Sequence, residues 1–180
     1  MLTPVSALLI IDAQLGLLDG EAAIPDAGEV IDRLVTLLAA ARIAGVPVIY
    51  LQNDGAPGSI DEQDTTNWFI HPRVTPKPGE LVLRKTRDDG FEGTKLETAL
   101  ARQHVTRLAV AGLLSEMCVS ATVRGALTRG IEVVLVHDAH GTYNLDDIPA
   151  SVVSRVAEHA LGDEVEIVNA AAVRFSRPAG

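Results

Sequence analysis

The chain has 180 residues, 47% of them hydrophobic, and 15 basic residues against 24 acidic ones give it a net charge of -9. This composition excludes a disordered chain, and the lack of a basic cluster argues against nucleic acid as a partner. The single cysteine excludes an internal disulfide and fits a reducing, cytoplasmic location. The apolar runs are of strand length, so no membrane span is predicted, and the first residues lack the basic and apolar regions of a signal peptide.

Short apolar runs alternate with helical patterns along the chain. The runs predicted to be strands are 7–11, 47–51, 81–85, 107–111, 132–136 and 165–168. Helical spacing of apolar residues predicts helices over 26–45, 94–100, 115–129 and 152–161, and a short final helix at 170–173. Asp26 with Glu29 and Thr94 with Glu97 have the spacing of capping boxes, and Gly45 is a typical helix end.

The alternation of strands and helices predicts an α/β fold, a three-layer α/β/α sandwich around a mostly parallel six-stranded sheet. No second core and no linker interrupts the pattern, so residues 1–180 are predicted to form a single domain. Residues 53–80 are one long connection, rich in Gly, Pro, Asn and Asp, that contains Trp68 and Phe69. A connection of this length in a compact domain is typically a functional loop or lid.

The only cysteine, Cys118, follows the fourth predicted strand and lies in the first turn of the helix predicted to begin at Ser115. The amides and the dipole of a helix N-terminus favour an anion, so a thiol in that position ionises more easily and can act as a nucleophile. The alternative is a small buried apolar residue, since unpaired cysteines are among the most buried residues.

Two charged residues stand at the ends of other strands, because Asp12 follows the first strand and Lys85 ends the third. Open α/β sheets bind ligands beyond the carboxyl ends of strands, at the point where strand order reverses. Asp12 and Cys118 meet there if the first and fourth strands are neighbours. A carboxylate can then take the thiol proton, and an ammonium can stabilise the thiolate. Singly, Asp12 is also a typical cap or turn residue, and Lys85 a solvated end of an edge strand.

Four short segments follow one another in order between residues 9 and 139: 9–14 (LIIDAQ), Lys85 with 91–96 (FEGTKL), 112–119 (GLLSEMCV) and 136–139 (VHDA). In these segments the chain resembles the isochorismatase-like cysteine hydrolases, a family that includes nicotinamidases, carbamoylsarcosine and ureidoacrylate amidohydrolases, and a streptothricin hydrolase. The resemblance implies a catalytic triad of Asp12, Lys85 and Cys118. It also implies an oxyanion hole from the backbone amides of Leu114 and Cys118, and a cis peptide bond between Leu113 and Leu114.

The sequence departs from the metal-binding nicotinamidases, which carry an Asp and two nearby His in the loop after the second strand. Here Asn53 and Asp54 follow that strand, and His71 is the only histidine in the loop. The sequence therefore predicts no metal and no cofactor, because a metal site needs several ligands together. His137 and His140, three residues apart near the end of the fifth strand, are interpreted as turn or pocket residues, with a metal pair as the alternative.

These features predict a hydrolase that cleaves a carbon–nitrogen bond, an amide or a lactam, of a small molecule through a thioester on Cys118. One alternative is vinyl-ether hydrolysis of an isochorismate-like substrate, with Asp12 as the acid and Cys118 idle. Another is a non-catalytic binding or oligomer scaffold with the same fold. The presence of Cys118 favours amide chemistry, since some isochorismatases that cleave a vinyl ether lack the cysteine.

Four residues are candidates for the substrate pocket: Gln14, Trp68, Phe69 and Phe91. The two loop aromatics, Trp68 and Phe69, are alternatively a small core under the loop or a subunit contact, and Phe91 is alternatively a packing residue. The exposed aromatic loop and the family's habit of associating predict a homodimer or a higher homo-oligomer.

Overall fold

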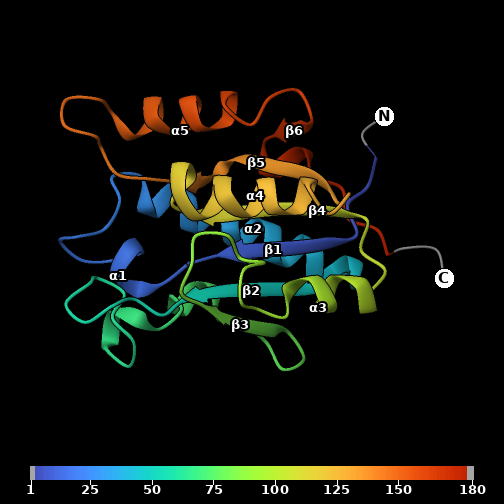
Figure 1. The fold of residues 1–180 in the computed structure, drawn as a ribbon, viewed down its shortest axis with the longest axis horizontal. Helices are drawn as coiled ribbons and strands as arrows, with labels where there is room; N and C mark the ends of the chain where they lie inside the picture. Colours follow the sequence, from blue (N-terminus) through green and yellow to red (C-terminus); the bar gives the residue numbers. More distant parts are fainter. Residues whose placement is uncertain (1–2, 178–180) are drawn as a thin grey trace.

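The computed structural model describes residues 3–177 and shows a central sheet between helices (Figure 1). Its six strands pair in the order β3-β2-β1-β4-β5-β6, and each neighbouring pair is parallel. The strands are β1 (Ala7–Ile11), β2 (Val48–Asn53), β3 (Leu81–Lys85), β4 (Arg107–Leu113), β5 (Glu132–Gly141) and β6 (Val165–Val168). The predicted parallel sheet is confirmed, and β1 and β4 are neighbours at its centre.

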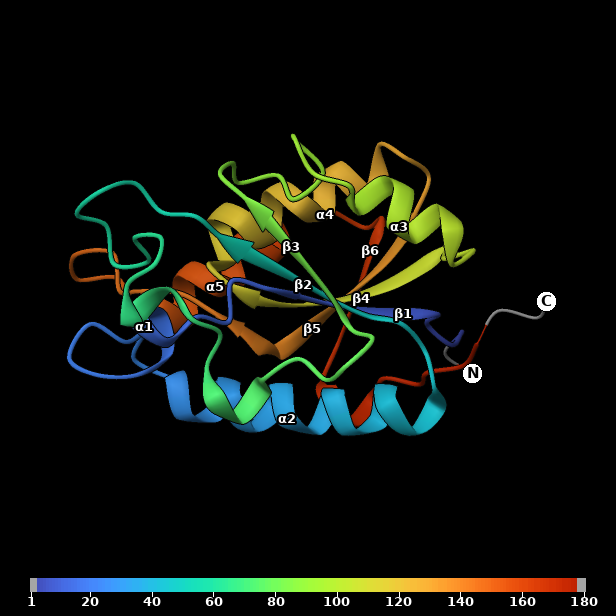
Figure 2. The same cartoon turned by 90° about the horizontal axis from the view of Figure 1, so that it is seen from below.

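Helices cover both faces of this sheet (Figure 2). They are α1 (Leu15–Leu18), α2 (Ala27–Ala44), α3 (Leu96–Arg102), α4 (Ser120–Leu127) and α5 (Ala150–His159). Helix α2 lies on one face, and α3 and α4 lie on the other, so the predicted three-layer arrangement is confirmed. None of the helices within residues 3–177 is long and apolar enough to cross a membrane.

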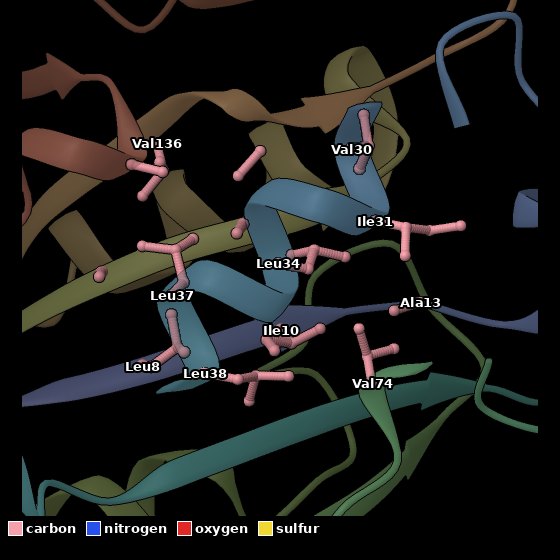
Figure 3. Close-up of a cluster of buried hydrophobic side chains, with 14 of the residues drawn as sticks. Leu8, Ile10, Ala13, Val30, Ile31, Leu34, Leu37, Leu38, Val74 and Val136 are labelled. Atoms are coloured by element: carbon pink, nitrogen blue, oxygen red, sulfur yellow. The ribbon is translucent and has the colours of Figure 1, made fainter. Parts of the chain in front are cut away.

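Strand β1 illustrates why the central strands have continuous apolar sequences. All five of its residues are buried, because layers of side chains cover both faces of the sheet. Leu8 and Ile10 pack in the cluster beneath α2 (Figure 3), whereas Leu9 and Ile11 pack in the cluster beside α3 and α4. Burial of each such side chain contributes about 1.5–3 kcal/mol. The position of Asp12, directly after β1, is therefore fixed by the core.

The helix starts differ from the two predicted capping boxes. Helix α2 begins right after Asp26, but the Asp26 side chain makes no capping hydrogen bond, because its φ of -101° and ψ of 25° are not the extended conformation of a capping residue. Thr94 Oγ1 accepts a hydrogen bond from the Leu96 amide at 3.1 Å. Glu97, however, pairs with Arg129 instead of Thr94, so the second box is also wrong.

Several elements differ from their predicted bounds by a few residues, and two of these differences affect the candidate site. Strand β5 continues five residues beyond the predicted 132–136, to Gly141. The helix predicted over 115–129 is divided, since a π-helical turn, η3 (Ser115–Val119), precedes the α-helix α4. Both differences lie at the carboxyl edge of the sheet, and both change the positions of candidate functional residues.

Candidate functional site

The carboxyl ends of β1, β3 and β4 bring together the three residues that sequence analysis placed there. The chain proceeds from β1 outward to β2 and β3, then returns to β4 on the other side of β1, so strand order reverses between β1 and β4. Asp12 follows β1, and Cys118 lies on η3 just after β4. Lys85 is the last residue of β3 and is paired in register with Asn53 of β2. Its side chain extends past the end of β2 towards Asp12.

The Lys85 ammonium is the centre of the cluster. Its Nζ lies 2.8 Å from Asp12 Oδ2 and 3.2 Å from Cys118 Sγ, and it also donates to Asn53 Oδ1 at 3.2 Å. The side chains of Lys85 and Asp12 are 0% and 4% exposed, so little solvent screens their charges. The second carboxylate oxygen of Asp12, Oδ1, is buried and has no hydrogen-bond partner among residues 3–177. It is therefore free to accept a proton.

Burial sets the protonation states of the three groups. It raises the pKa of Asp12 from 3.8 to about 6, against the opposing charge of Lys85. Burial, reinforced by the Asp12 charge, raises the pKa of Cys118 to about 12. The pKa of Lys85 is also raised, because Asp12 and Cys118 outweigh the effect of burial. At neutral pH the resting site thus contains a carboxylate, an ammonium and a neutral thiol. The prediction that this thiol ionises more easily than a free one is wrong for the resting site.

The backbone around Cys118 explains part of this difference. Met117 has a φ of -105° and a ψ of -105°, which interrupts the helix, and α4 begins only at Ser120. Cys118 is therefore not in the first turn of a regular helix, and the predicted effect of the helix N-terminus does not apply as stated. The Leu114 carbonyl holds the turn by accepting from the amides of Met117 at 3.1 Å and Val119 at 3.2 Å.

The strand that enters this turn needs a glycine at its end. Gly112 has a φ of +124°, and a Cβ at that position would lie 2.0 Å from the Ile11 carbonyl oxygen of the neighbouring strand. Only glycine accommodates both the conformation and the close approach. The peptide bond between Leu113 and Leu114, next in the chain, is cis. Within residues 3–177 the Leu114 amide donates to no acceptor, whereas the Leu114 carbonyl is fully engaged.

Replacing Lys85 by Met should slow alkylation of Cys118 by iodoacetamide. The ammonium lowers the pKa of the thiol, so its removal raises that pKa further and leaves less thiolate. A nearby opposite charge shifts a pKa by roughly 1–3 units, so we expect the alkylation rate at a fixed pH near 8 to fall by at least about tenfold. Lys95→Met, on an exposed side chain, is the matched control. Equal rates in a folded Lys85→Met variant would contradict this prediction.

Gln14 is a buried residue that links the end of β2 to the loop around Trp68 by hydrogen bonds. Its amide nitrogen donates to the carbonyls of Asn53 at 3.0 Å and Trp68 at 2.9 Å, and its amide oxygen accepts from the Asn53 amide at 2.8 Å. The side chain is fully buried, so Gln14 positions the loop rather than lining a pocket. Sequence reasoning missed Asn53, which accepts from Lys85 and donates to Asp61 at 2.6 Å. Its place directly after a strand end was the available signal.

The three aromatic candidates have different environments. Trp68 is partly buried, donates its indole N–H to Asp54 at 3.0 Å and lies under the Arg84 guanidinium. Phe69 packs edge-on against Trp68 and is 56% exposed. Both belong to the loop that Gln14 ties to the ends of β1 and β2. Phe91 is instead buried in the cluster beside α3 and α4, which identifies it as a packing residue.

The loop after β2 uses its polar residues for its own structure. His71 Nδ1 accepts from the Arg73 amide and begins the turn Pro72–Val74, and burial lowers the pKa of His71. Asp54 is bound by Arg84 at 2.9 Å as well as by Trp68. Among residues 3–177, three metal-ligating side chains converge only at His137, His140 and Glu158, away from this loop.

Comparison with known proteins agrees with this architecture. A model of the isochorismatase domain matches residues 6–161. The chain belongs to the isochorismatase family. A streptothricin hydrolase of Streptomyces noursei, a relative within this family, is 54% identical over 182 residues, which cover 97% of this chain and 66% of that protein. The resemblance found in the four sequence segments is thereby confirmed at the level of the family.

Other isochorismatase-family relatives are more distant. A crystal structure of an isochorismatase from Pseudomonas putida KT2440 has a TM-score of 0.89 and 30% identity, with 96% of this chain and 94% of that chain covered. A ureidoacrylate amidohydrolase of Methylobacterium radiotolerans is 30% identical over 141 residues, which cover 62% of this chain and 55% of that protein. The fold is thus shared across the family, while the names of these relatives refer to different substrates.

Proposed function

We propose that this protein is a cysteine hydrolase that cleaves the carbonyl–nitrogen bond of a small amide or lactam through an acyl-thioester on Cys118. The observation that carries the proposal is the single ammonium of Lys85, which contacts Asp12 Oδ2 at 2.8 Å and Cys118 Sγ at 3.2 Å. Asp12 Oδ1 has no partner within residues 3–177 and can receive the thiol proton. Such a nucleophile beside a base, oriented by a third group, suits acyl transfer.

In the first half of the proposed reaction, Asp12 takes the proton from Cys118 while Sγ attacks the carbonyl carbon. Because the pKa of the thiol is about 12 and that of Asp12 about 6, we expect the proton to move as the carbon–sulfur bond forms. The Lys85 ammonium offsets the negative charge throughout. The Leu114 amide, which lacks an acceptor within residues 3–177, and the Cys118 amide are proposed to stabilise the tetrahedral oxyanion.

The protonated Asp12 then donates its proton to the departing nitrogen, the carbon–nitrogen bond breaks, and the acyl group stays on Sγ. In the second half, Asp12 removes a proton from water as the water oxygen attacks the thioester carbonyl. The carbon–sulfur bond breaks, the carboxylic acid leaves, and the proton returns to Cys118. A pKa of about 6 suits a group that must both accept and donate a proton near neutral pH.

Quenching the enzyme during turnover tests the proposed intermediate. Streptothricin is the first substrate to assay, on the strength of the relative of that name, followed by a panel of primary amides, lactams and N-carbamoyl compounds. We expect mass spectrometry to find the acyl group on the peptide that contains Cys118, and hydroxylamine to remove it. Product formation without an adduct, together with full activity of Cys118→Ser, would instead indicate direct attack by water and favour the vinyl-ether reading.

The activity should fall on the acid side of pH 6. The profile of kcat/KM reports the free enzyme, in which Asp12 must be ionised to act as the base. Its pKa is raised from 3.8 to about 6, so the base form is lost as pH falls through that value. We expect a decrease of about tenfold per pH unit below about pH 6 and a plateau from about pH 7 upward.

The plateau should extend far into the alkaline range, because the pKa of Cys118 is about 12 and that of Lys85 is raised as well. Circular dichroism at each pH shows whether the enzyme stays folded. A folded enzyme with a constant kcat/KM down to about pH 4, the range of an unperturbed aspartate, would contradict the role of Asp12.

A further inference from the structure

A bulge in β5 turns two histidines towards the same helix. Val110 of β4 pairs with Leu135 of β5 and Gly112 pairs with His140, so two steps along β4 correspond to five along β5. In a regular strand, residues three positions apart face opposite sides of the sheet. Because of the bulge, His137 and His140 both reach Glu158 on α5. The two residues between them, Asp138 and Ala139, face the side of the sheet covered by α2. There Asp138 pairs with Arg33 and accepts a hydrogen bond from the Ala170 amide.

The two imidazoles converge on one carboxylate oxygen. Glu158 Oε1 lies 2.5 Å from His137 Nδ1 and 3.0 Å from His140 Nε2, and the three potential ligand atoms all lie within 4.8 Å of one another. The side chains of Glu158 and His140 are 4% and 1% exposed, while that of His137 is 37% exposed.

The ligand set and its surroundings match a metal site. Two imidazole nitrogens and one carboxylate oxygen are the three protein ligands of many Zn²⁺ sites, and the exposed side of His137 leaves room for a water as the fourth ligand. Metal–ligand bonds of about 2.0–2.1 Å in a tetrahedron place the ligand atoms roughly 3.3 Å apart. The two separations from Glu158 Oε1, 2.5 and 3.0 Å, are each less than about 1 Å shorter than this, and the two imidazole nitrogens lie within 4.8 Å of each other.

The second ring nitrogen of His140 is already held in the way that metal ligands usually are. His140 Nδ1 lies 2.8 Å from Ser115 Oγ, which in turn lies 2.9 Å from Ser154 Oγ. Such a bond fixes the orientation of the ring and leaves Nε2 directed at the site. Ser115 is 1% exposed, so it cannot reach a substrate, and its hydroxyl serves this network.

We propose that His137, His140 and Glu158 form a binding site for one divalent transition-metal ion of the Zn²⁺ type, separate from the Cys118 centre. Within the structure described, none of the three forms a hydrogen bond or ion pair with Asp12, Lys85 or Cys118. The ion would join β5, α5 and, through Ser115, the turn η3. Its role is to stabilise this corner of the fold, and the proposed reaction at Cys118 involves no step at the ion.

Titration of the chelator-treated protein with CoCl₂ and ZnCl₂ tests the site without reference to turnover. We expect one Co²⁺ per chain with the visible absorption of a nitrogen-liganded ion, displacement by Zn²⁺, and a higher Tm with Zn²⁺ than with chelator. His137→Ala, which removes the most exposed ligand, should weaken Co²⁺ binding at least about hundredfold and abolish the Tm shift. His159→Ala is the matched control, because His159 lies on the same helix, is exposed and is not part of the cluster.

Glu158→Gln, a second variant, keeps the shape of the side chain and removes its charge, and it should also lose the Co²⁺ absorption. Equal binding by wild type and both variants, or no binding of Co²⁺ and Zn²⁺ by the wild type, would overturn the proposal and leave the cluster as a hydrogen-bonded network only. The outcome is independent of the proposed function. Turnover of the chelated enzyme, well below its Tm, is expected to persist, and its loss in Cys118 variants is measured in the absence of metal.

Discussion

Cys118→Ala should lower kcat by at least about 10⁴-fold, because loss of a nucleophile in covalent catalysis leaves only the contributions of binding and oxyanion stabilisation. The fold should survive. The substitution removes one sulfur atom that is hydrogen-bonded to Lys85 at 3.2 Å and Asp88 at 3.6 Å, and it leaves the bond between Lys85 and Asp12 in place. The measurements are kcat on the substrate identified in the panel and Tm by circular dichroism.

Thr98→Ala is a suitable control, because Thr98 is an exposed residue of α3 and is not part of the cluster around Lys85. It should retain the wild-type kcat. A folded Cys118→Ala enzyme that keeps a tenth of the wild-type rate would rule out the thioester, since no thioester can form without the Cys118 sulfur.

The fold was predictable because its strands carry the signature of a sheet covered on both faces. In β1 every residue from Ala7 to Ile11 is apolar and every one is buried, so its strand character and its central position follow from the same five residues. Gly45 was equally informative, because it ends α2 with a φ of 66°, a left-handed conformation that glycine adopts more readily than other residues. These signals are local in the sequence and agree with the tertiary structure.

The candidate site was predictable only in part. The placement of Asp12, Lys85 and Cys118 follows from strand ends, which sequence reveals. The π turn at η3 does not, because the sequence from Ser115 has the pattern of an ordinary helix and gives no sign of the break at Met117. The raised pKa of Cys118 was also inaccessible, since it results from burial and from the Asp12 charge rather than from a helix end.

Long-range partners explain the remaining omissions. Glu158 lies 18 positions after His140 and comes from a helix, and only the bulge in β5 turns both histidines towards it. A spacing of three residues in a strand would by itself have separated the two side chains onto opposite faces. Asn53 was likewise visible as a strand-end residue, but its contact with Lys85 depends on the pairing of β2 with β3.

Asp12→Asn should lower kcat by about 10²- to 10⁴-fold, the range for loss of a general base, because a neutral amide cannot take the proton of Cys118. Asparagine suits the position. Residue 12 has a φ of 49°, a conformation in which Asp and Asn are more readily accommodated than most other residues. Lys85 also keeps its bond to Asn53 at 3.2 Å, so the folded state should persist with a lower Tm.

The same substitution should make the thiol more reactive towards iodoacetamide. After burial, the Asp12 charge is the largest cause of the raised pKa of Cys118, and Lys85 opposes it. Without the carboxylate, the ammonium acts alone on the sulfur, the pKa falls and the thiolate fraction at a fixed pH near 8 increases. Faster labelling with slower hydrolysis separates loss of the base from collapse of the site, which would reduce both rates.

Asp32→Asn is the control for this comparison, because Asp32 forms an ion pair with Arg73 in which both side chains are more than half exposed. It should change neither the labelling rate nor kcat. If Asp12→Asn hydrolyses substrate at the wild-type rate, the carboxylate is not the base. If its labelling slows while its Tm stays close to that of the wild type, the Asp12 charge favours the thiolate, and the assignment of Asp12 and Lys85 to opposing effects on the sulfur is wrong.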